Sequence, residues 1–229
     1  MRELPARIRE DDVSDDRRHA ALILAGGEAR RLNGVDKASL DLGGATPLSL
    51  LVAALQDACD AIAISTNTRN PASAALEKPM LADPIPGVGP LGGVLAGLEW
   101  AHREGFARLL TVPGDTPFIP SNLTEKLTAP LSVASSGGRT HPLVACWPTA
   151  AAPKLRRWIE ERMADARPTE GKSAAWRVRD FMETLGVWRV VEFPVENGDP
   201  FFNINTPHDL AMARTRQKAS CVDTKNIRP

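Results

Sequence analysis

The stretch LILAGGEARRLNGVDK, close to the start of the sequence, combines the residue types that bind a polyphosphate. Gly26 and Gly27 follow an apolar run, and without Cβ atoms their backbone can turn sharply and approach a ligand closely. Backbone N–H groups in such a turn form a cradle for an anion. Arg30, Arg31 and Lys37 supply positive charge beside it. The stretch predicts a phosphate-binding loop, although a plain turn followed by solvated cations has the same composition.

Two better-known phosphate-binding patterns do not fit this stretch. The P-loop pattern GxxxxGK[ST] cannot be written through Gly27, Gly34 and Lys37, and the stretch is not a GxGxxG fingerprint either. The glycines and cations therefore need partner motifs elsewhere in the chain before they indicate a site.

The decapeptide TVPGDTPFIP places Asp115 just beyond an apolar run, in a loop that contains three prolines. A carboxylate there can hold Mg²⁺, which prefers one or two carboxylates together with phosphate oxygens and water. The alternative is an ordinary aspartate in a turn, a common place for this residue. The rigidity of the proline-rich loop favours a metal ligand.

The decapeptide FFNINTPHDL places Asn203 and Asn205 directly before a predicted helix. Either Asn205 or Thr206 can cap that helix by accepting from its first N–H groups. We expect Thr206 to be the cap, with Pro207 in the first helical position. Asn203 is then available to complete a metal or phosphate site.

Small polar residues and a carboxylate occur in two further loops. STN closes a predicted strand with Ser65 and Asn67, which suit hydrogen bonds to a base or a ribose. LADPIPGVGPLGG is crowded with proline and glycine and has Asp83 as its only ionisable side chain. This loop can form a wall of a base or ribose pocket, and ordinary loop chemistry is the alternative for both segments.

Composition excludes several classes of protein. Lys and Arg together number 28, as do Asp and Glu, so the formal net charge is zero. A general nucleic-acid-binding protein usually carries a basic excess, and we expect no nucleic-acid partner. Cys59, Cys146 and Cys221 are far apart and odd in number, which argues against a disulfide framework and a structural zinc site. Reduced thiols of a cytosolic protein fit this pattern.

The sequence contains no signal for a membrane. The N-terminal stretch MRELPARIREDDVSDDRRH is charged throughout and lacks the apolar core of a signal peptide. No apolar run approaches the roughly 20 residues that span a bilayer. These features predict a cytoplasmic protein without a membrane partner.

Apolar runs alternate with helical patterns along the chain. The predicted strands are 20–25, 61–66, 79–84, 107–113, 141–147 and 186–193. The predicted helices are 47–59, 89–105, 121–128 with Ser121 as its cap, 150–164, 173–185 and 205–214. We expect a flexible arm over 1–19, one domain over 20–214 and a flexible tail over 215–229.

The alternation of strands and helices predicts an α/β fold with a mainly parallel, doubly wound sheet. Ligands of such sheets bind at the carboxyl ends of the strands. The glycines after LILA and the aspartate after LLTVPG both fall at that edge. We therefore expect the candidate motifs to meet there.

Taken in order, these motifs resemble the molybdenum cofactor guanylyltransferase (MobA-type) family of nucleotidyltransferases. The resemblance covers about residues 20–214 and is carried by LAGGEARRLNGVDKASL, DPIPGVGPLGGVLAGL, VPGDTPFIP, HPLVAC and FFNINTPHDL. It implies a Rossmann-like three-layer α/β/α sandwich with a mostly parallel central sheet. It also implies transfer of GMP from GTP to the terminal phosphate of molybdenum-bound molybdopterin, with release of pyrophosphate and with Mg²⁺ as cofactor.

The resemblance and the motifs together assign the candidate residues. The nucleotide-binding residues are Leu24, Ala25, Gly26, Gly27, Lys37, Ser65, Asn67, Asp83 and Asp115; the catalytic ones are Lys37, Asp115 and Arg31; Asn203 and Asn205 bind molybdopterin; and Asp115 is the Mg²⁺ ligand. The substrates implied are GTP and molybdenum-bound molybdopterin, and a transient contact with a molybdoenzyme or a chaperone is expected.

The sequence departs from the family pattern at three positions. Gly114 stands beside Asp115 where the family more often has cysteine, which should loosen the loop; Asn33 replaces a glycine; and Ser65 falls where the family often has asparagine. Two alternative functions stay open. One is a cytidylyltransferase or sugar-phosphate nucleotidyltransferase of the same fold, although the GG of LAGG favours GTP. The other is a non-catalytic nucleotide-binding protein that carries the cofactor, which retention of Asp115 and Lys37 argues against.

Overall fold

The computed structural model describes residues 19–26, 31–32, 35–68, 71–128, 131–165, 176–186 and 188–225. The strands are β1 (His19–Leu24), β2 (Arg31–Leu32), β3 (Val35–Asp36), β4 (Ala61–Ser65), β5 (Met80–Leu81), β6 (Arg108–Pro113), β7 (Ser132–Ser136), β8 (Arg139–Pro148) and β9 (Arg189–Phe193). The helices are α1 (Pro47–Leu55), α2 (Pro71–Ala74), α3 (Pro90–Arg103), α4 (Leu123–Lys126), α5 (Ala152–Asp165), α6 (Val178–Thr184) and α7 (Pro207–Lys225), with short 3-10 turns η2 (Lys37–Ser39) and η3 (Thr149–Ala151).

Among the described residues, seven strands form one sheet in the order β5-β4-β1-β6-β8-β7-β9. The pairs β5–β4, β4–β1, β1–β6 and β7–β9 are parallel, whereas β8 is antiparallel to both of its neighbours. Every strand of this sheet except β8 therefore runs in the same direction, and the expected mostly parallel sheet is confirmed. The apolar runs of β1 and β4 are buried because helices cover both faces.

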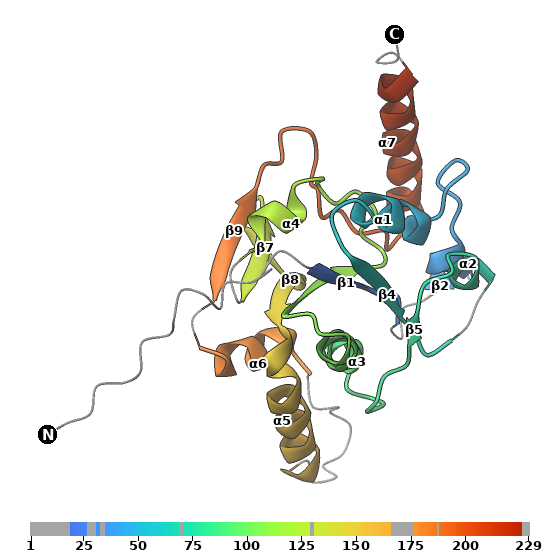
Figure 1. Cartoon of the computed structure of the whole chain (residues 1–229). Coiled ribbons are helices and arrows are strands. Elements are labelled where there is room, and N and C mark those ends of the chain that lie inside the picture. Colours follow the sequence, from blue (N-terminus) through green and yellow to red (C-terminus); the bar gives the residue numbers. More distant parts are fainter. Residues whose placement is uncertain are drawn as a thin grey trace, which may run out of the picture.

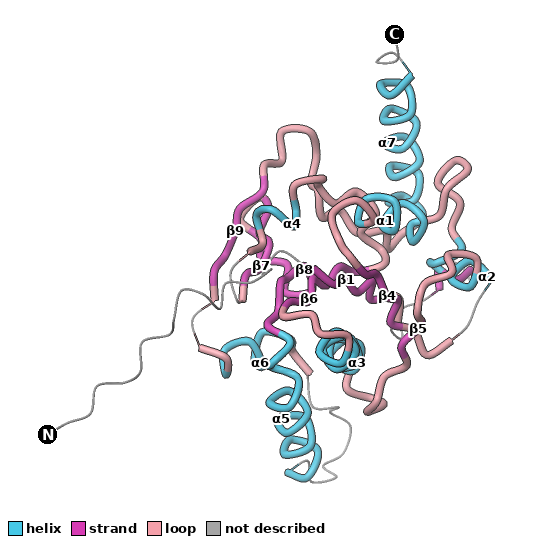
Figure 2. The backbone as a smooth tube through the Cα atoms, in the orientation of Figure 1, coloured by secondary structure: helices cyan, strands magenta, loops and turns pink. Residues whose placement is uncertain are grey.

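The sheet lies between two helical layers, as expected (Figures 1 and 2). Helices α1 and α4 lie over one face, and α3, α5 and α6 lie over the other. Side chains of β1 alternate between the two faces, so that Ile23 packs with α1 and Leu22 packs with α3. The core beneath α1 includes Ile23, Leu48, Leu51, Leu55, Ile64 and Val112, and the core beneath α3 includes Leu22, Leu91, Leu95, Leu98, Leu109 and Trp147.

Two glycines bring α3 unusually close to the sheet. A Cβ atom on Gly93 would lie 2.4 Å from Oγ of Ser65, and one on Gly97 would lie 2.5 Å from Cδ2 of Leu22. No real Cβ atom tolerates such distances, so glycine at these positions lets the helix axis approach β1 and β4. The close approach places the first turn of α3 next to the loop that carries Asp83.

The register of the strands brings the candidate motifs to one edge. Leu24, the last residue of β1, pairs with Ser65 at the end of β4 and with Pro113 at the end of β6. The loops that follow these three strands therefore begin side by side. They begin with Gly26, Asn67 and Asp115 among their residues, which lie at the carboxyl edge of the sheet as expected.

Strand β7 and helices α4 and α7 differ from the predicted elements. Strand β7 was not predicted, because its sequence SVASS is rich in serine and lacks an apolar run. Helix α4 begins after Asn122, which makes no side-chain cap, and Ser121 is not its cap. Helix α7 continues to Lys225 instead of ending at Arg214, because the segment TRQKASCVDTK contains neither proline nor glycine. For the helix predicted over 205–214, the position at which the helix ends is therefore the part that was wrong.

Gly114, which the sequence predicts to loosen the loop beside Asp115, contacts the end of β1. The N–H group of Gly114 donates to the carbonyl of Leu24 over 2.9 Å, and a Cβ atom here would lie 3.2 Å from that same oxygen. Gly114 thus fits closely against the end of β1.

Over the described residues, no helix has the length and apolar character that crossing a membrane requires.

Candidate active site

Backbone hydrogen bonds join the loops at the carboxyl edge into one scaffold. The N–H group of Ala25 donates to the carbonyl of Ser65 over 2.9 Å. The N–H group of Ile204 donates to the carbonyl of Asp115, also over 2.9 Å. The ends of β1, β4 and β6 and the segment before α7 are therefore fixed relative to one another, although they come from distant parts of the sequence.

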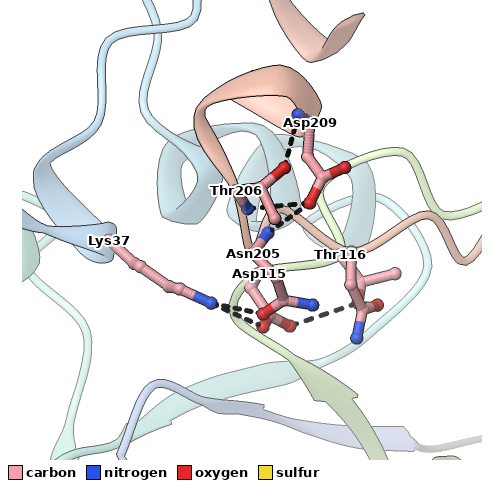
Figure 3. Close-up of polar contacts among 7 residues, drawn as sticks. Lys37, Asp115, Thr116, Asn205, Thr206 and Asp209 are labelled. Atoms are coloured by element: carbon pink, nitrogen blue, oxygen red, sulfur yellow. Dashed lines mark hydrogen bonds and ion pairs between the residues drawn. The ribbon is translucent and has the colours of Figure 1, made fainter. Parts of the chain in front are cut away.

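Lys37 reaches two of the predicted site residues (Figure 3). Its Nζ atom donates to Oδ1 of Asn205 over 2.5 Å and lies 3.5 Å from Oδ2 of Asp115. The side chain of Lys37 is 14% exposed and that of Asp115 is 26% exposed, so the ion pair is only partly screened by solvent. One cation, one carboxylate and one amide oxygen thus converge as the sequence predicts.

The position of Lys37 depends on a small apolar cluster. Lys37 begins η2, and the residues that follow pack against the segment before α7 and against α7 itself. The buried members of this cluster are Leu32, Leu40, Leu42, Ile204 and Ala213. The cluster holds the lysine-bearing segment against the asparagine-bearing one, which explains how residues 168 positions apart come into contact.

Asn203 is linked to Asp115 through Thr116. The hydroxyl of Thr116 donates to Oδ1 of Asn203 over 2.7 Å, and its Oγ1 atom lies 3.5 Å from Oδ1 of Asp115. Thr116 is not among the site residues predicted from the sequence. The feature that could have indicated it is a hydroxyl directly after Asp115, the candidate metal ligand.

The first turn of α7 decides between the two possible caps. Oδ2 of Asp209 accepts from the backbone N–H groups of Asn205 and Thr206, and the N–H group of Asp209 donates to Oγ1 of Thr206 over 3.1 Å. This reciprocal arrangement makes Thr206 the cap, as expected. The N–H groups of Asn205 and Thr206 hold the pKa of the Asp209 carboxyl below its usual value. The side chain of Asn205 is thereby left to accept from Lys37 (Figure 3).

Asn67 and Asp83 form a second polar pair, next to the start of α3. Each donates one hydrogen bond to the other, and both bonds are 2.8 Å long. Gly92 makes room for the carboxylate, since a Cβ atom there would lie 2.8 Å from Cγ of Asp83. The pair joins the ends of β4 and β5 and presents amide and carboxylate groups that are exposed.

Other predicted residues have less exposed or undescribed side chains. Ser65 is 1% exposed and its side chain lies beneath Gly93, and the side chain of Leu24 is buried in the core. Their part in ligand binding is therefore limited to the backbone in this arrangement. Gly26 is exposed beside them. Gly27, Arg30 and Asn33 lie outside the described residues, as does the side chain of Arg31.

The donor set at Asp115 fits Mg²⁺ better than a structural metal. No group of three or more His, Cys, Asp or Glu side chains gathers within the described ranges. A single carboxylate beside a phosphate-binding region is the usual protein contribution to a Mg²⁺ site, because this ion keeps water and phosphate oxygens as its other ligands. Asp115 supplies one such carboxylate, and Thr116 links it to Asn203.

Comparisons with known proteins agree with this geometry. The MobA-like NTP transferase domain matches residues 21–173. A molybdenum cofactor guanylyltransferase from Rhodopseudomonas palustris (strain HaA2) is 41% identical over 203 residues, which cover 84% of this chain and 89% of the relative. One from Acidiphilium cryptum (strain JF-5) is 44% identical over 194 residues, which cover 84% and 92%. This chain belongs to the MobA-like NTP transferase family.

Solved structures share the fold of this MobA-like chain at lower identity. Molybdopterin-guanine dinucleotide biosynthesis protein A from Archaeoglobus fulgidus has a TM-score of 0.63 at 23% identity, covering 88% of this chain and 99% of the other. A 2-C-methyl-D-erythritol 4-phosphate cytidylyltransferase from Thermus thermophilus has a TM-score of 0.59 at 18% identity, covering 86% and 98%. The nucleotidyltransferase fold implied by the sequence motifs is thus confirmed.

Proposed function

We propose that this MobA-like protein transfers GMP from GTP to the terminal phosphate of molybdenum-bound molybdopterin. The observation that carries the proposal is the convergence of Lys37, Asp115 and Asn205 at the carboxyl edge of the sheet. The relatives named molybdenum cofactor guanylyltransferase support the choice of substrates. The products are the guanine dinucleotide form of the cofactor and pyrophosphate.

The reaction needs positioning and charge neutralisation more than proton transfer. A phosphate oxygen of the acceptor attacks the α-phosphorus of GTP, a new P–O bond forms, and the bond to the oxygen bridging to the β-phosphate breaks as pyrophosphate leaves. The acceptor is already an anion, so no general base is required. The difficulty is repulsion between an anion and a triphosphate, which preorganised cations and N–H donors offset.

Each described group has a place in this scheme. We infer that Lys37 binds phosphate oxygens of the nucleotide, and that the backbone of Ala25 and Gly26, just beyond the end of β1, contacts the same phosphates. Asn203 and Asn205 offer amide groups to the phosphate of the acceptor. Asp115 would hold Mg²⁺, which when bound neutralises phosphate charge and orients the reacting groups.

The nucleotide half of the site lies on the side of β4 and β5. Asn67 and Asp83 present polar groups that suit the edge of a guanine base or a ribose. Their mutual hydrogen bonds hold both side chains in one orientation before the ligand arrives, which lowers the entropic cost of binding. We propose that this pair is the part of the site that distinguishes nucleotides.

The assay that tests the proposal uses the purified chain, molybdenum-loaded molybdopterin and each of the four nucleoside triphosphates with Mg²⁺. We expect pyrophosphate release and dinucleotide formation with GTP. Preference for CTP would identify a cytidylyltransferase instead, and binding of GTP without any turnover would identify a carrier. The proposed setting is the cytoplasm, where transient transfer of the product to a molybdoenzyme or its chaperone would follow.

A further inference from the structure

A second set of polar side chains lies at the same edge of the sheet, outside the residues discussed above. Oγ of Ser136, at the end of β7, lies 2.8 Å from Nε2 of His141 on β8. The same oxygen lies 2.8 Å from Oδ1 of Asp199, in the segment between β9 and α7. Ser136 is 3% exposed, and both of its hydrogen bonds are partly buried.

The direction of the hydrogen bonds follows from the number of protons. The serine hydroxyl has one proton and donates it to the carboxylate of Asp199, which can only accept. Nε2 of His141 must then carry the proton that is donated to Oγ of Ser136. The order His141–Ser136–Asp199 is not that of a hydrolytic triad, in which the imidazole lies between the other two groups. Ser136 is therefore not an activated nucleophile.

Further contacts join this chain to the segment that carries the two asparagines. Oδ1 of Asp199 also accepts from the N–H group of Phe201 over 2.9 Å, and the carbonyl of Asp199 accepts from a guanidinium N–H of Arg216 over 2.7 Å. The ring of Phe201 packs on the ring of His141, with centroids 4.9 Å apart. Asp199 is thus held by β7 and by α7, and Phe201 is held by β8.

Only a short stretch of backbone separates these anchors from Asn203 and Asn205. Its far end is fixed by the hydrogen bond from Ile204 to the carbonyl of Asp115 and by the cap of α7. The near end has Asp199 and Phe201 as its attachments to the sheet. The orientation of the two asparagines therefore depends on the His141–Ser136–Asp199 chain at one end and on Asp115 at the other.

The protonation state of His141 agrees with this arrangement. Burial lowers the pKa of His141, and the positive charge of Arg139 acts in the same direction, whereas Asp199 and Glu192 oppose the shift. The imidazole is then neutral near pH 7 and has a single N–H group, which the geometry assigns to Nε2.

We propose that His141, Ser136 and Asp199 are positioning residues for the acceptor substrate: their hydrogen-bond chain holds the segment 199–205 so that Asn203 and Asn205 face the acceptor phosphate. The proposal rests on the proposed function for the identity of the acceptor. The anchoring itself is a property of the protein alone. The chain acts on the acceptor half of the site and leaves the nucleotide half, on the side of β4 and β5, unchanged.

The test compares Ser136→Ala with a matched control, Thr149→Val. Thr149 is 3% exposed and its hydroxyl donates to the carbonyl of Phe106 over 2.7 Å, at the opposite edge of the sheet. Each variant loses one buried hydroxyl and the two hydrogen-bond contacts that it makes. We expect Ser136→Ala to raise the KM for molybdopterin about tenfold while the KM for GTP stays within about twofold. Thr149→Val should lower thermal stability without raising the KM for molybdopterin relative to that for GTP.

Amide hydrogen exchange provides a readout that does not depend on activity. In Ser136→Ala the amides of 199 and 201–205 should exchange faster than in the wild type, and in Thr149→Val they should not. Unchanged exchange in Ser136→Ala, or an equal rise in both KM values, would overturn the proposal. If the wild type transfers no GMP to molybdopterin, the proposed function fails, and the exchange measurement still decides whether the segment is anchored in this way.

A conservative pair of variants separates hydrogen bonding from folding. His141→Gln retains an N–H donor near the position of Nε2, whereas His141→Ala removes it. We expect the alanine variant to have a raised KM for molybdopterin and faster amide exchange. In the glutamine variant both quantities should lie close to their wild-type values. Equal defects in the two variants would show that the ring of His141 acts only through packing on Phe201, and would contradict the hydrogen-bond chain.

Discussion

Asn67 and Asp83 exchange two hydrogen bonds, each 2.8 Å long, across the ends of two neighbouring strands. The amide group of Asn67 donates to the carboxylate, and the backbone N–H group of Asp83 donates back to the amide oxygen. A pair of this kind orients both side chains at once, because the two bonds hold the amide of Asn67 at both of its ends. Its exposure at the carboxyl edge makes it the first target for a test of nucleotide choice.

Asn67→Ala should weaken GTP binding about tenfold, or about 1.4 kcal/mol, because the carboxylate of Asp83 loses the contact that orients it. The preference for GTP over CTP should shrink by a similar factor. Calorimetric titration with both nucleotides measures this. Thr66→Val is the control, since it removes a hydroxyl from the same loop whose hydrogen bond stays within the loop. Unchanged affinity for both nucleotides would place the base elsewhere.

Lys37→Ala should weaken binding of GTP more than that of GMP. In the proposed function the lost charge binds the distal phosphates, and a hydrogen bond to a charged group is worth about 1.5–3 kcal/mol. The measurement is the dissociation constant of each nucleotide for the variant and the wild type. Lys218→Ala, at an exposed position of α7, removes the same charge away from the site. Equal losses for GTP and GMP would move Lys37 away from the polyphosphate.

Asp115→Asn should lower turnover about a hundredfold or more while the fold is retained, because the loss of the proposed Mg²⁺ ligand would remove several kcal/mol of charge stabilisation in the transition state. The amide keeps the size of the side chain, so the backbone contact with Ile204 persists. Turnover is measured over a Mg²⁺ titration, with Asp57→Asn as an exposed control. Near wild-type turnover at saturating Mg²⁺ would show that Asp115 is not the metal ligand.

The Asp209 carboxyl should make thermal stability depend on pH in the acid range. Its pKa in the folded protein lies below the ordinary value of 3.8, because it accepts from the N–H groups of Asn205 and Thr206. A lowered folded pKa means that the ionised group stabilises the fold above the ordinary value and that this stabilisation is lost as the pH falls through the lowered one.

Asp209→Ala therefore provides the check on that dependence. The difference in melting temperature between the wild type and this variant should stay constant from about pH 7 to about pH 5 and shrink below about pH 4. A difference that does not change down to the lowest pH measured would mean that the charge of Asp209 does not contribute to the cap.

The fold was predictable where apolar runs are long. Strands β1, β4 and β6 are buried on both faces, and such runs are visible in the sequence alone. Strand β7 was not predictable in this way, since it buries serines. Ser136 is accommodated there because His141 and Asp199 hydrogen-bond to it. No local pattern indicates such an arrangement, because Asp199 is distant in sequence.

The candidate site was predictable to a similar extent. The segments with Lys37 and Asp115 were expected to meet because parallel strands end at one edge, and Asn205 was assigned to the site by the family resemblance; the fold brings all three together. The roles of Thr116 and Ser136 needed the three-dimensional arrangement, since each acts through a residue far along the chain. Ser65 shows the converse: its polarity suggested a ligand contact, and the close approach of α3 buries it.

The length of α7 has a practical consequence for anyone who wishes to shorten this protein. Figure 1 shows the helix rising from the body of the molecule toward the C-terminus, and trimming it at Arg214 would follow the domain limit that the sequence predicts. Such a truncation would delete Arg216, whose guanidinium lies 4.6 Å from the ring centre of Phe118 and donates to the carbonyl of Asp199. Phe118 follows the Asp115 loop and Asp199 begins the segment with the asparagines. The part of the helix that looks dispensable in the sequence therefore bridges two segments that build the proposed active site.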